Sequence, residues 1–188
     1  MAHVIAYFGL IVLTGLERIV ELVISRRNAN WAFERGGREY GQRHFPAMVC
    51  LHVGLLLACV AEVLLLNRPF VPALGWPMLV VSLFCQLGRY LVIASLRNQW
   101  NTRVIVVPGL ARVRRGVYRF GWMRHPNYVI VAIEGIALPL VHSAWIAAGA
   151  FTILNAILLL GFRIPTENRA LTELTDPDAA TRAPGSVR

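Results

Sequence analysis

The chain has 188 residues, of which 56% are hydrophobic and 15% are charged, and its mean hydropathy is +0.55. This composition excludes an ordinary soluble domain and indicates an integral membrane protein. The formal net charge is +9, but the 19 basic residues, which are all arginine, lie between apolar runs instead of forming one stripe, and this pattern argues against a nucleic-acid-binding protein.

Three apolar segments are long enough to cross a bilayer as helices, because about 20 helical residues span roughly 30 Å of hydrocarbon. They cover residues 4–24, 45–66 and 76–96. No basic residue precedes the first segment and no small-residue cleavage site follows it, so we expect a retained span and not a signal peptide. Its charged residues Glu17, Arg18 and Glu21 have the spacing of a local ion pair near the end of the span.

Polar residues also occur inside the second and third segments. A charged side chain near the bilayer centre costs at least about 2.5 kcal/mol, so each such residue needs a partner or a function. Glu62 lies near the end of the second segment, where solvation at the interface is an alternative to pairing. Gln86 and Arg89 lie one turn apart in the third segment, and we expect them to face the protein interior, either joining helices or lining a polar cavity.

Two common kinds of site are not expected from the sequence. Cys50, Cys59 and Cys85 lie in apolar segments without metal-ligand spacing, so we expect small buried hydrophobic side chains and neither a disulfide framework nor a metal centre. No Gly-rich dinucleotide-binding fingerprint follows a strand in the sequence, so we expect no Rossmann domain.

Two further apolar segments, residues 128–141 and 144–162, predict a tight helical hairpin. Only His142 and Ser143 separate them. The first segment is short for a span and contains Pro139, whereas the second is nearly of full length. We therefore expect an all-α integral membrane protein with about five transmembrane helices and a C-terminal helical hairpin.

The arginines predict the orientation of the five spans. The connections at residues 25–44 and 97–124 are rich in arginine and, with five spans, share one face with the C-terminal tail. The positive-inside rule makes that face cytoplasmic and places the N-terminus outside. We divide the chain into N-terminal helices (residues 1–70), a core (71–175) and a disordered tail (176–188).

The sequence RHPNY, residues 124–128, marks the start of the fourth span. Proline is favoured in the first turn of a helix, where its missing N–H would be unpaired, so Pro126 predicts a helix start at the cytoplasmic boundary. The unpaired backbone donors of that turn form an anion site, to which Arg124, His125, Asn127 and Tyr128 add donors and an aromatic face. The alternative interpretation is an interfacial anchor with arginine and tyrosine at the level of the lipid headgroups.

The fifth span ends in GFRIPTENRALTEL. Arg163 and Glu167 are four residues apart, which places both on one face of a continuous helix, although Pro165 either kinks or restarts that helix. A salt bridge that caps the span is the alternative. With the RHPNY helix start, the pair predicts one buried polar pocket with an apolar floor. Polar residues inside the spans that are candidates for lining its substrate part are Gln86, Arg89, Glu134 and Asn155.

The sequence GVYRFGWMRHPNYVIVAIEGIALPL, followed by NAILLLGFRIPTENRAL, resembles the isoprenylcysteine carboxyl methyltransferase family of integral membrane enzymes. The preceding QWNTRVIVVPG is similar to the bacterial branch, which is associated with O-methylation of alkylpyrones or alkylresorcinols. The resemblance covers residues 80–175, and the first two spans match only in character.

The resemblance implies binding of S-adenosylmethionine in a cytoplasmic pocket and methylation of a lipid-like acceptor that enters from the bilayer. The family pattern, together with the donor Asn127, implies a cofactor site at Gly116, Tyr118, Arg124, His125, Pro126, Asn127 and Tyr128. The Arg plus Glu element of the family falls on Arg163 and Glu167, which are the implied catalytic residues. Val117 and Asn168 stand where proline and a second glutamate are common, so the role of a second carboxylate does not carry over.

The methyl acceptor is the least constrained part of this interpretation. An Ala-rich chain with arginine as its only strong base suggests a GC-rich bacterial genome, so we rank alkylpyrones and alkylresorcinols above prenylcysteine carboxylates. We expect a bacterial plasma membrane location, membrane lipids as neighbours and no nucleic-acid partner. The alternatives are a transporter or assembly factor without catalysis, although no matched polar positions occur in two halves of the sequence, and a membrane reductase that binds NADPH.

Overall fold

The chain is an all-α membrane protein, as the sequence predicts. The computed structural model describes residues 1–42, 44–110, 113, 115–119 and 126–175. The α-helices in this part of the chain are α1 (Ala2–Phe33), α2 (His44–Leu65), α3 (Pro72–Leu96), α4 (Pro126–Leu140), α5 (Trp145–Leu158) and α6 (Ile164–Thr175). Three shorter helical turns accompany them, namely η1 (Arg97–Gln99), η2 (Gly116–Arg119) and the π-helical η3 (Leu159–Arg163), which joins α5 to α6.

Three of the described helices are long and apolar enough to cross a membrane, namely α2, α3 with η1, and the helix that runs from α5 to Ala170. α4 is apolar but shorter, and the predicted number of five spans remains a prediction. α1 extends to Phe33, so the expectation that Arg26 and Arg27 lie in a connection is wrong. The extended end of α1 is held because Asn28 donates hydrogen bonds to backbone carbonyls of the segment that follows α3.

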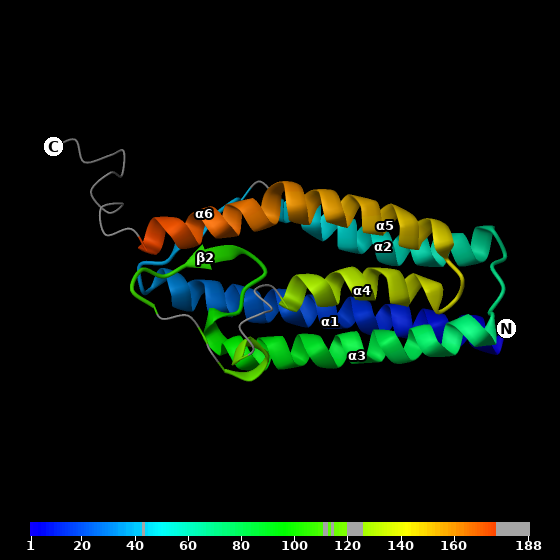
Figure 1. Cartoon of the computed structure of the whole chain (residues 1–188). Coiled ribbons are helices and arrows are strands. Elements are labelled where there is room, and N and C mark those ends of the chain that lie inside the picture. Colours follow the sequence, from blue (N-terminus) through cyan, green and yellow to red (C-terminus); the bar gives the residue numbers. More distant parts are fainter. Residues whose placement is uncertain (43, 111–112, 114, 120–125, 176–188) are drawn as a thin grey trace.

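The two Arg-rich connections meet at one end of the helical bundle. β1 (Arg38–Tyr40) pairs antiparallel with β2 (Val104–Val106), with Glu39 opposite Ile105. Figure 1 shows β2 and α6 at the same end, whereas the N-terminus lies at the opposite end with the α2–α3 connection and the α4–α5 turn. The two connections therefore share one face, as predicted, and the side of the membrane on which this face lies stays a prediction.

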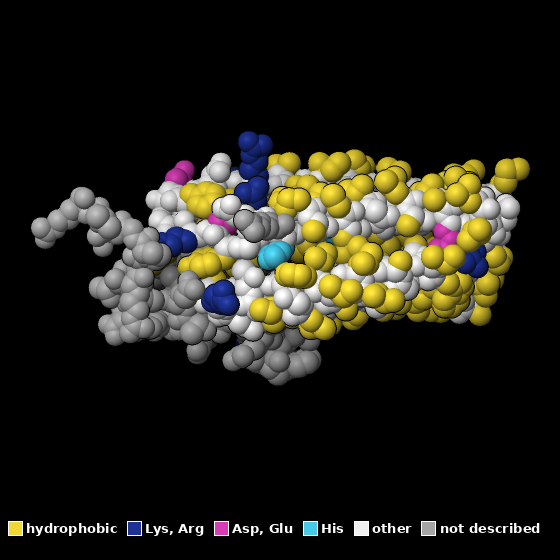
Figure 2. Space-filling model, turned by 90° about the horizontal axis from the view of Figure 1, so that it is seen from above, with side chains coloured by type: hydrophobic (Ala, Val, Ile, Leu, Met, Phe, Trp, Pro, Cys, Tyr) yellow, Lys and Arg dark blue, Asp and Glu magenta, His cyan; other side chains and the backbone are white. Residues whose placement is uncertain are grey.

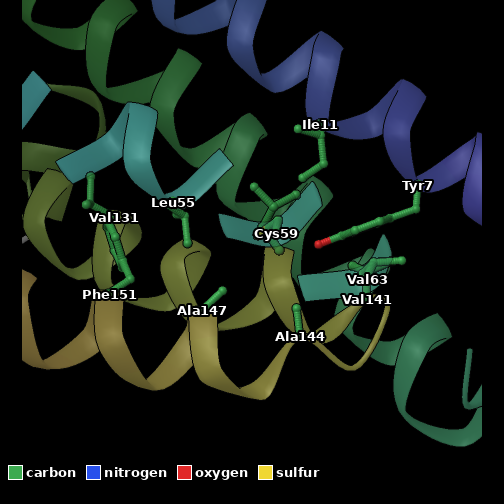
Figure 3. Packing of buried hydrophobic residues seen from close by; sticks show 11 residues of the cluster. Tyr7, Ile11, Leu55, Cys59, Val63, Val131, Val141, Ala144, Ala147 and Phe151 are labelled. Carbon is green, nitrogen blue, oxygen red and sulfur yellow. The ribbon is translucent and has the colours of Figure 1, made fainter. Parts of the chain in front are cut away.

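The helices α1, α2, α4 and α5 meet around a core of apolar side chains. Figure 3 shows Tyr7 of α1 pointing toward α2, near Cys59, with Ala147 among the small residues at the start of α5. Close approach is also required between α4 and α5, because a Cβ on Gly135 would lie 2.0 Å from the ring of Phe151. Small residues at helix contacts are typical of membrane bundles. This packing fixes the ends of α4 and α5 relative to each other.

Glu62 of α2 holds the start of α5. The α4–α5 connection is the predicted tight turn, with Ser143 at φ +56°. The Glu62 carboxylate accepts the N–H groups of Ile146 at 3.1 Å and Ala147 at 2.7 Å and pairs with Arg68 at 2.8 Å. Backbone N–H groups in the first turn of a helix have no partner within that helix. Glu62 is therefore buried and paired, and its solvation at the interface is excluded.

The outer surface carries a broad apolar band. Large apolar side chains on the long helices are mostly exposed, as are Leu57 on α2 and Phe84 on α3. Figure 2 shows hydrophobic side chains along most of one face, with charged side chains gathered toward the ends. Cys59 and Cys85 are buried as expected, but the expectation is wrong for Cys50, which is exposed because it occupies an outward-facing position on α2.

Candidate functional site

The predicted catalytic pair and the tyrosine of the RHPNY sequence come together in space. α4 begins at Pro126, as predicted, which places Tyr128 in its first turn. The Tyr128 hydroxyl donates a hydrogen bond to Oε2 of Glu167 and accepts one from Nε of Arg163 at 3.2 Å. The Arg163 guanidinium lies 5.9 Å from the centre of the Tyr128 ring. We call Tyr128, Arg163 and Glu167 the Tyr–Arg–Glu cluster.

A π-helical turn sets the direction of Arg163. Pro165 has no N–H to donate to the carbonyl of Gly161, and its ring crowds that carbonyl. The chain forms the wider turn η3, in which the N–H of Ile164 bonds the carbonyl of Leu159, five residues earlier. The helix therefore does not restart at the proline, and both members of the predicted pair reach the same tyrosine. Single π-turns of this kind are frequent at functional sites.

A cavity of about 450 Å³ lies between α1, α2, α4 and α5, next to the Tyr–Arg–Glu cluster. This volume is within the range of sites that bind small molecules. Its polar lining near the cluster includes Asn127, Tyr128, Asn155 and Arg163. Apolar side chains of α1 and α2 form much of the remaining wall. Residues predicted separately as catalytic, cofactor-binding and substrate-binding thus line one cavity.

The cavity reaches the lipid-facing surface between α1 and α2. Val12, Leu16, Ile19 and Val53 line it, yet each of these side chains is at least half exposed, at 50–61%. Because these side chains line the cavity and are also exposed on the outer surface, they form the rim of an opening. In a membrane this opening faces acyl chains, so an apolar ligand can reach the cavity without crossing water.

Charged residues of α1, α3 and α4 form a buried ion cluster beside the cavity. Arg89 donates hydrogen bonds to both carboxylate oxygens of Glu21, with Nε at 2.8 Å, and Arg18 donates to the same carboxylate at 3.1 Å. Arg18 also donates to Gln86 at 2.9 Å, and Gln86 donates to Glu134 at 2.9 Å. The ion pair predicted within α1 is confirmed, and it is part of a network that joins three helices.

The four residues predicted to line a substrate pocket divide into two pairs. Arg89 and Asn155 line the 450 Å³ cavity, and Arg89 also joins α3 to α1, so both interpretations of this arginine apply. Gln86 and Glu134 lie outside the lining, because their polar groups bond each other and Arg18. They support the wall of the cavity and do not form its surface.

Gly116 and Tyr118 lie in η2, against the end of α3. Gly116 has φ +58°, and an added Cβ would lie 2.0 Å from Oγ of Ser95, so this position requires glycine. Burial raises the pKa of Tyr118 to about 12, and the negative charge of Glu167 acts in the same direction. η2 is therefore within electrostatic reach of the Tyr–Arg–Glu cluster, although neither predicted residue lines the cavity. Arg124 and His125 lie outside the described residues.

Sequence reasoning missed the contribution of α2 to the site. Met48 and His52 lie one turn apart and both line the cavity. The Met48 sulfur accepts a hydrogen bond from Nη1 of Arg163 at 3.4 Å. A histidine inside an apolar span is costly unless it has a partner or a function, and this is the signal in the sequence that could have indicated the position.

Trp100 forms part of the cavity wall and was also missed. It is 3% exposed and lines the cavity just after α3. Asn28 of α1 donates hydrogen bonds to the carbonyls of Trp100 at 2.7 Å and Arg97 at 3.1 Å, and Ser25 donates to the side chain of Asn101 at 2.7 Å. The WNT sequence is thus fixed against the end of α1.

Comparison with known proteins gives two relationships. The sequence pattern of the Isoprenylcysteine carboxyl methyltransferase (ICMT) family matches residues 78–173, which include η2, α4, α5 and most of α3 and α6. An uncharacterized protein of Bacillus subtilis (strain 168), YpbQ, is 37% identical over 168 residues, which is 89% of this chain and 97% of the relative. No solved structure matches the chain.

Proposed function

The chain belongs to the isoprenylcysteine carboxyl methyltransferase family and is a membrane methyltransferase, and on this premise we propose that it transfers a methyl group from S-adenosylmethionine to an oxygen atom of a lipid-like acceptor. The observation that carries the proposal is the cavity of about 450 Å³, in which a lipid-facing opening shares one space with Tyr128 and Arg163 of the Tyr–Arg–Glu cluster. A water-soluble methyl donor and a membrane-borne acceptor can meet at such a boundary.

The polar end of the cavity has the groups that fit S-adenosylmethionine. The amino-acid carboxylate of the cofactor suits the start of α4, where backbone N–H groups lack helical partners and Asn127 adds a donor. The sulfonium cation suits the face of the Tyr128 ring. When bound, the cofactor supplies an electrophilic methyl group. The proposed binding site is completed by the residues that match the family pattern, Gly116, Tyr118, Arg124, His125 and Pro126.

The apolar part of the cavity suits an acceptor with a long hydrocarbon chain. That chain can remain among the exposed residues of α1 and α2 while the polar head lies near Arg163, with Arg89 and Asn155 as further contacts. Arg163 would hold an ionised carboxylate, or the oxygen anion formed from a hydroxyl. We rank a long-chain alkylpyrone or alkylresorcinol above a prenylcysteine carboxylate, because the WNT and RHPNY sequences follow the bacterial branch of the family.

The residues of the chain accelerate methyl transfer mainly by placement. Methyl transfer is an in-line displacement, and holding two reactants in the correct geometry lowers the barrier by up to about 7–11 kcal/mol. The Tyr128 hydroxyl bonds both Arg163 and Glu167, so the charged groups of the cluster have fixed positions. Fixed charges need no reorganisation during the reaction, which is why they stabilise a transition state better than water does.

We further propose that the end of the bundle with β1, β2 and α6 faces the cytoplasm of a bacterial cell. The Arg-rich connections meet at this end, and arginine-rich connections stay on the cytoplasmic side during membrane insertion. The N-terminus lies at the opposite end, which agrees with an odd number of crossings such as the predicted five.

Direct measurement of methyl transfer tests this function. Purified protein in lipid vesicles is incubated with S-adenosylmethionine labelled in the methyl group and with an alkylpyrone, an alkylresorcinol or a prenylcysteine. We expect label in one of the first two acceptors, and we expect Glu167→Ala to reduce turnover more than cofactor affinity. No transfer to any acceptor would contradict the proposal, and consumption of NADPH by the same protein would favour the reductase alternative.

The lipid-facing route is tested at Gly15 of α1, which lines the cavity and whose added Cβ would lie 3.5 Å from a methyl group of Leu56. Gly15→Leu fits at the backbone but fills part of the opening. It should lower kcat/KM for a long-chain acceptor and leave the affinity for S-adenosylhomocysteine unchanged. Gly9→Leu is the matched control, because Gly9 is on the same helix, lies outside the cavity lining and has no neighbour within 4 Å. Equal losses in the two variants would contradict the route.

A further inference from the structure

The cavity contains a proton acceptor that the methyl transfer proposed above does not yet use. Among the described residues that line it, Glu21 and His52 have side chains with lone pairs that can accept a proton. Glu21 is occupied, because Arg18 and Arg89 donate three hydrogen bonds to its carboxylate. Glu167 bonds Tyr128 and lies outside the lining. Of the residues that the structure describes, His52 is therefore the base available within the cavity.

The surroundings of His52 select one tautomer of its ring. Nδ1 lies 2.8 Å from the carbonyl oxygen of Met48. Because a carbonyl oxygen can only accept, Nδ1 carries the hydrogen, and the neutral ring has its lone pair on Nε2. Within the part of the chain that the structure describes, Nε2 makes no hydrogen bond. The ring also contacts Phe151 edge-on, with centroids 5.5 Å apart and planes at 84°, so two contacts fix its orientation.

Arg163 of η3 contacts α2 at Met48, one turn before His52. Met48 links them, because its carbonyl accepts the hydrogen bond from the His52 ring while its sulfur accepts one from the Arg163 guanidinium. All three side chains line the cavity. His52 and Arg163 thus lie on one wall of the cavity. His52 can take up a proton, and Arg163 can stabilise the negative charge on the oxygen of the methyl acceptor.

We propose that His52 is the general base that removes the proton from a weakly acidic hydroxyl of the acceptor, a phenol or an enol. This inference rests on the methyl transfer proposed above. The O–H proton moves to Nε2, a bond forms between the oxygen and the methyl carbon, and the S–CH₃ bond breaks with its electron pair remaining on sulfur. Arg163 stabilises the charge on the oxygen, and the imidazolium later releases its proton to water. An ionised carboxylate acceptor would not need this base.

The charges around His52 are compatible with a neutral imidazole that is ready to accept a proton. Three arginines and two glutamates leave a net formal charge of +1 around the ring, which favours an anionic acceptor oxygen beside it. The charged and titratable groups that face this region are Arg18 and Glu21 on α1, Arg89 on α3, Tyr128 and Glu134 on α4, and Arg163 after α5.

The first test measures the ionisation of a bound phenol in the absence of a methyl donor. The probe is a nitrophenol with a long alkyl chain, whose ionised form absorbs visible light. Wild-type protein should lower the apparent pKa of the bound probe by at least about one pH unit relative to His52→Asn, because a phenolate–imidazolium pair forms only when His52 is present. Asparagine retains a side-chain N–H for the Met48 carbonyl but is not a base.

The control for this titration is His142→Asn, because His142 is a buried histidine at the α4–α5 turn outside the cavity lining. This variant should give the wild-type value. If His52→Asn does not fold, His52→Gln replaces it with the same expectation. An equal apparent pKa of the probe in wild-type and His52-substituted protein, shifted or not, overturns the proposal.

The second test compares two acceptors with the same alkyl chain, a resorcinol and a fluorinated resorcinol that is ionised at the assay pH. His52→Asn should lower kcat by about 10²-fold or more for the resorcinol, the usual contribution of a general base, and by no more than about threefold for the ionised acceptor. Equal losses of kcat for both acceptors would contradict the role of His52 as a base but would leave the proposed methyl transfer unaffected. Failure of the wild-type protein to methylate any acceptor, the alkylpyrone and the prenylcysteine included, overturns the proposed function, whereas transfer to the prenylcysteine carboxylate alone overturns only the role of His52.

Discussion

Replacement of Arg89 by methionine measures how strongly the buried ion cluster stabilises the bundle. Arg89 makes two hydrogen bonds to Glu21, lies 3.6 Å from Glu134 and has a side chain that is 8% exposed. Each hydrogen bond to a charged partner contributes about 1.5–3 kcal/mol, and removing one partner of a buried pair costs about 3–5 kcal/mol because the other charge stays unpaired. Arg18 remains beside both carboxylates, so we expect the lower end of this range, a loss of about 3 kcal/mol in the free energy of unfolding.

The assay is equilibrium unfolding in detergent of Arg89→Met, Glu21→Met and the double variant. The double variant should recover part of the loss, because methionine fills similar volume without an unpaired charge, and the coupling energy should be at least about 1 kcal/mol. Arg35→Met, which breaks an exposed pair with Glu34, is the control and should cost no more than about 1 kcal/mol. Additive losses for Arg89→Met and Glu21→Met would refute the interpretation of the cluster as a coupled pair.

Three further predictions follow from single contacts. Glu62→Ala should lower the free energy of unfolding by about 3 kcal/mol, because two N–H groups of α5 and Arg68 lose their acceptor, whereas Glu62→Gln should cost less; thermal unfolding compares the two. Gly116→Ala should displace η2, since its Cβ would lie 2.0 Å from Oγ of Ser95, and unchanged affinity for S-adenosylhomocysteine in calorimetry would remove η2 from the proposed site. Tyr118 ionises near pH 10 in the unfolded chain but only near pH 12 in the folded protein, so its contribution to stability is complete below pH 10 and is lost as the pH rises toward 12. Tyr118→Phe should remove that decline from a pH series of unfolding free energies.

The helices α1 to α5 could be predicted because each contains an apolar run, and the positions of Pro126 and of the two-residue turn marked the ends of two of them. The end of α1 could not be predicted in this way. Hydropathy indicates where the lipid ends, whereas the helix continues to Phe33 through contacts between Asn28 and a segment far away in the sequence. Such contacts leave no local pattern in the sequence.

The candidate site was also predictable from the sequence only in part. The spacing of Arg163 and Glu167 predicted a shared face, and the RHPNY sequence predicted a helix start, so the Tyr–Arg–Glu cluster was within reach of sequence reasoning. The role of α2 was not. A membrane helix is apolar on all sides, so its sequence does not reveal which face looks inward, and only the packed bundle shows that His52 lines the cavity.

Calorimetry of the purified protein with S-adenosylhomocysteine and, separately, with NADPH tests the central claim most directly. The claim is that the polar end of the cavity accepts the methyl donor of a membrane methyltransferase. We predict saturable binding of S-adenosylhomocysteine that is weakened in Asn127→Ala, which removes a donor for the amino-acid carboxylate, together with no binding of NADPH. Binding of NADPH alone, or of neither compound, would contradict the account.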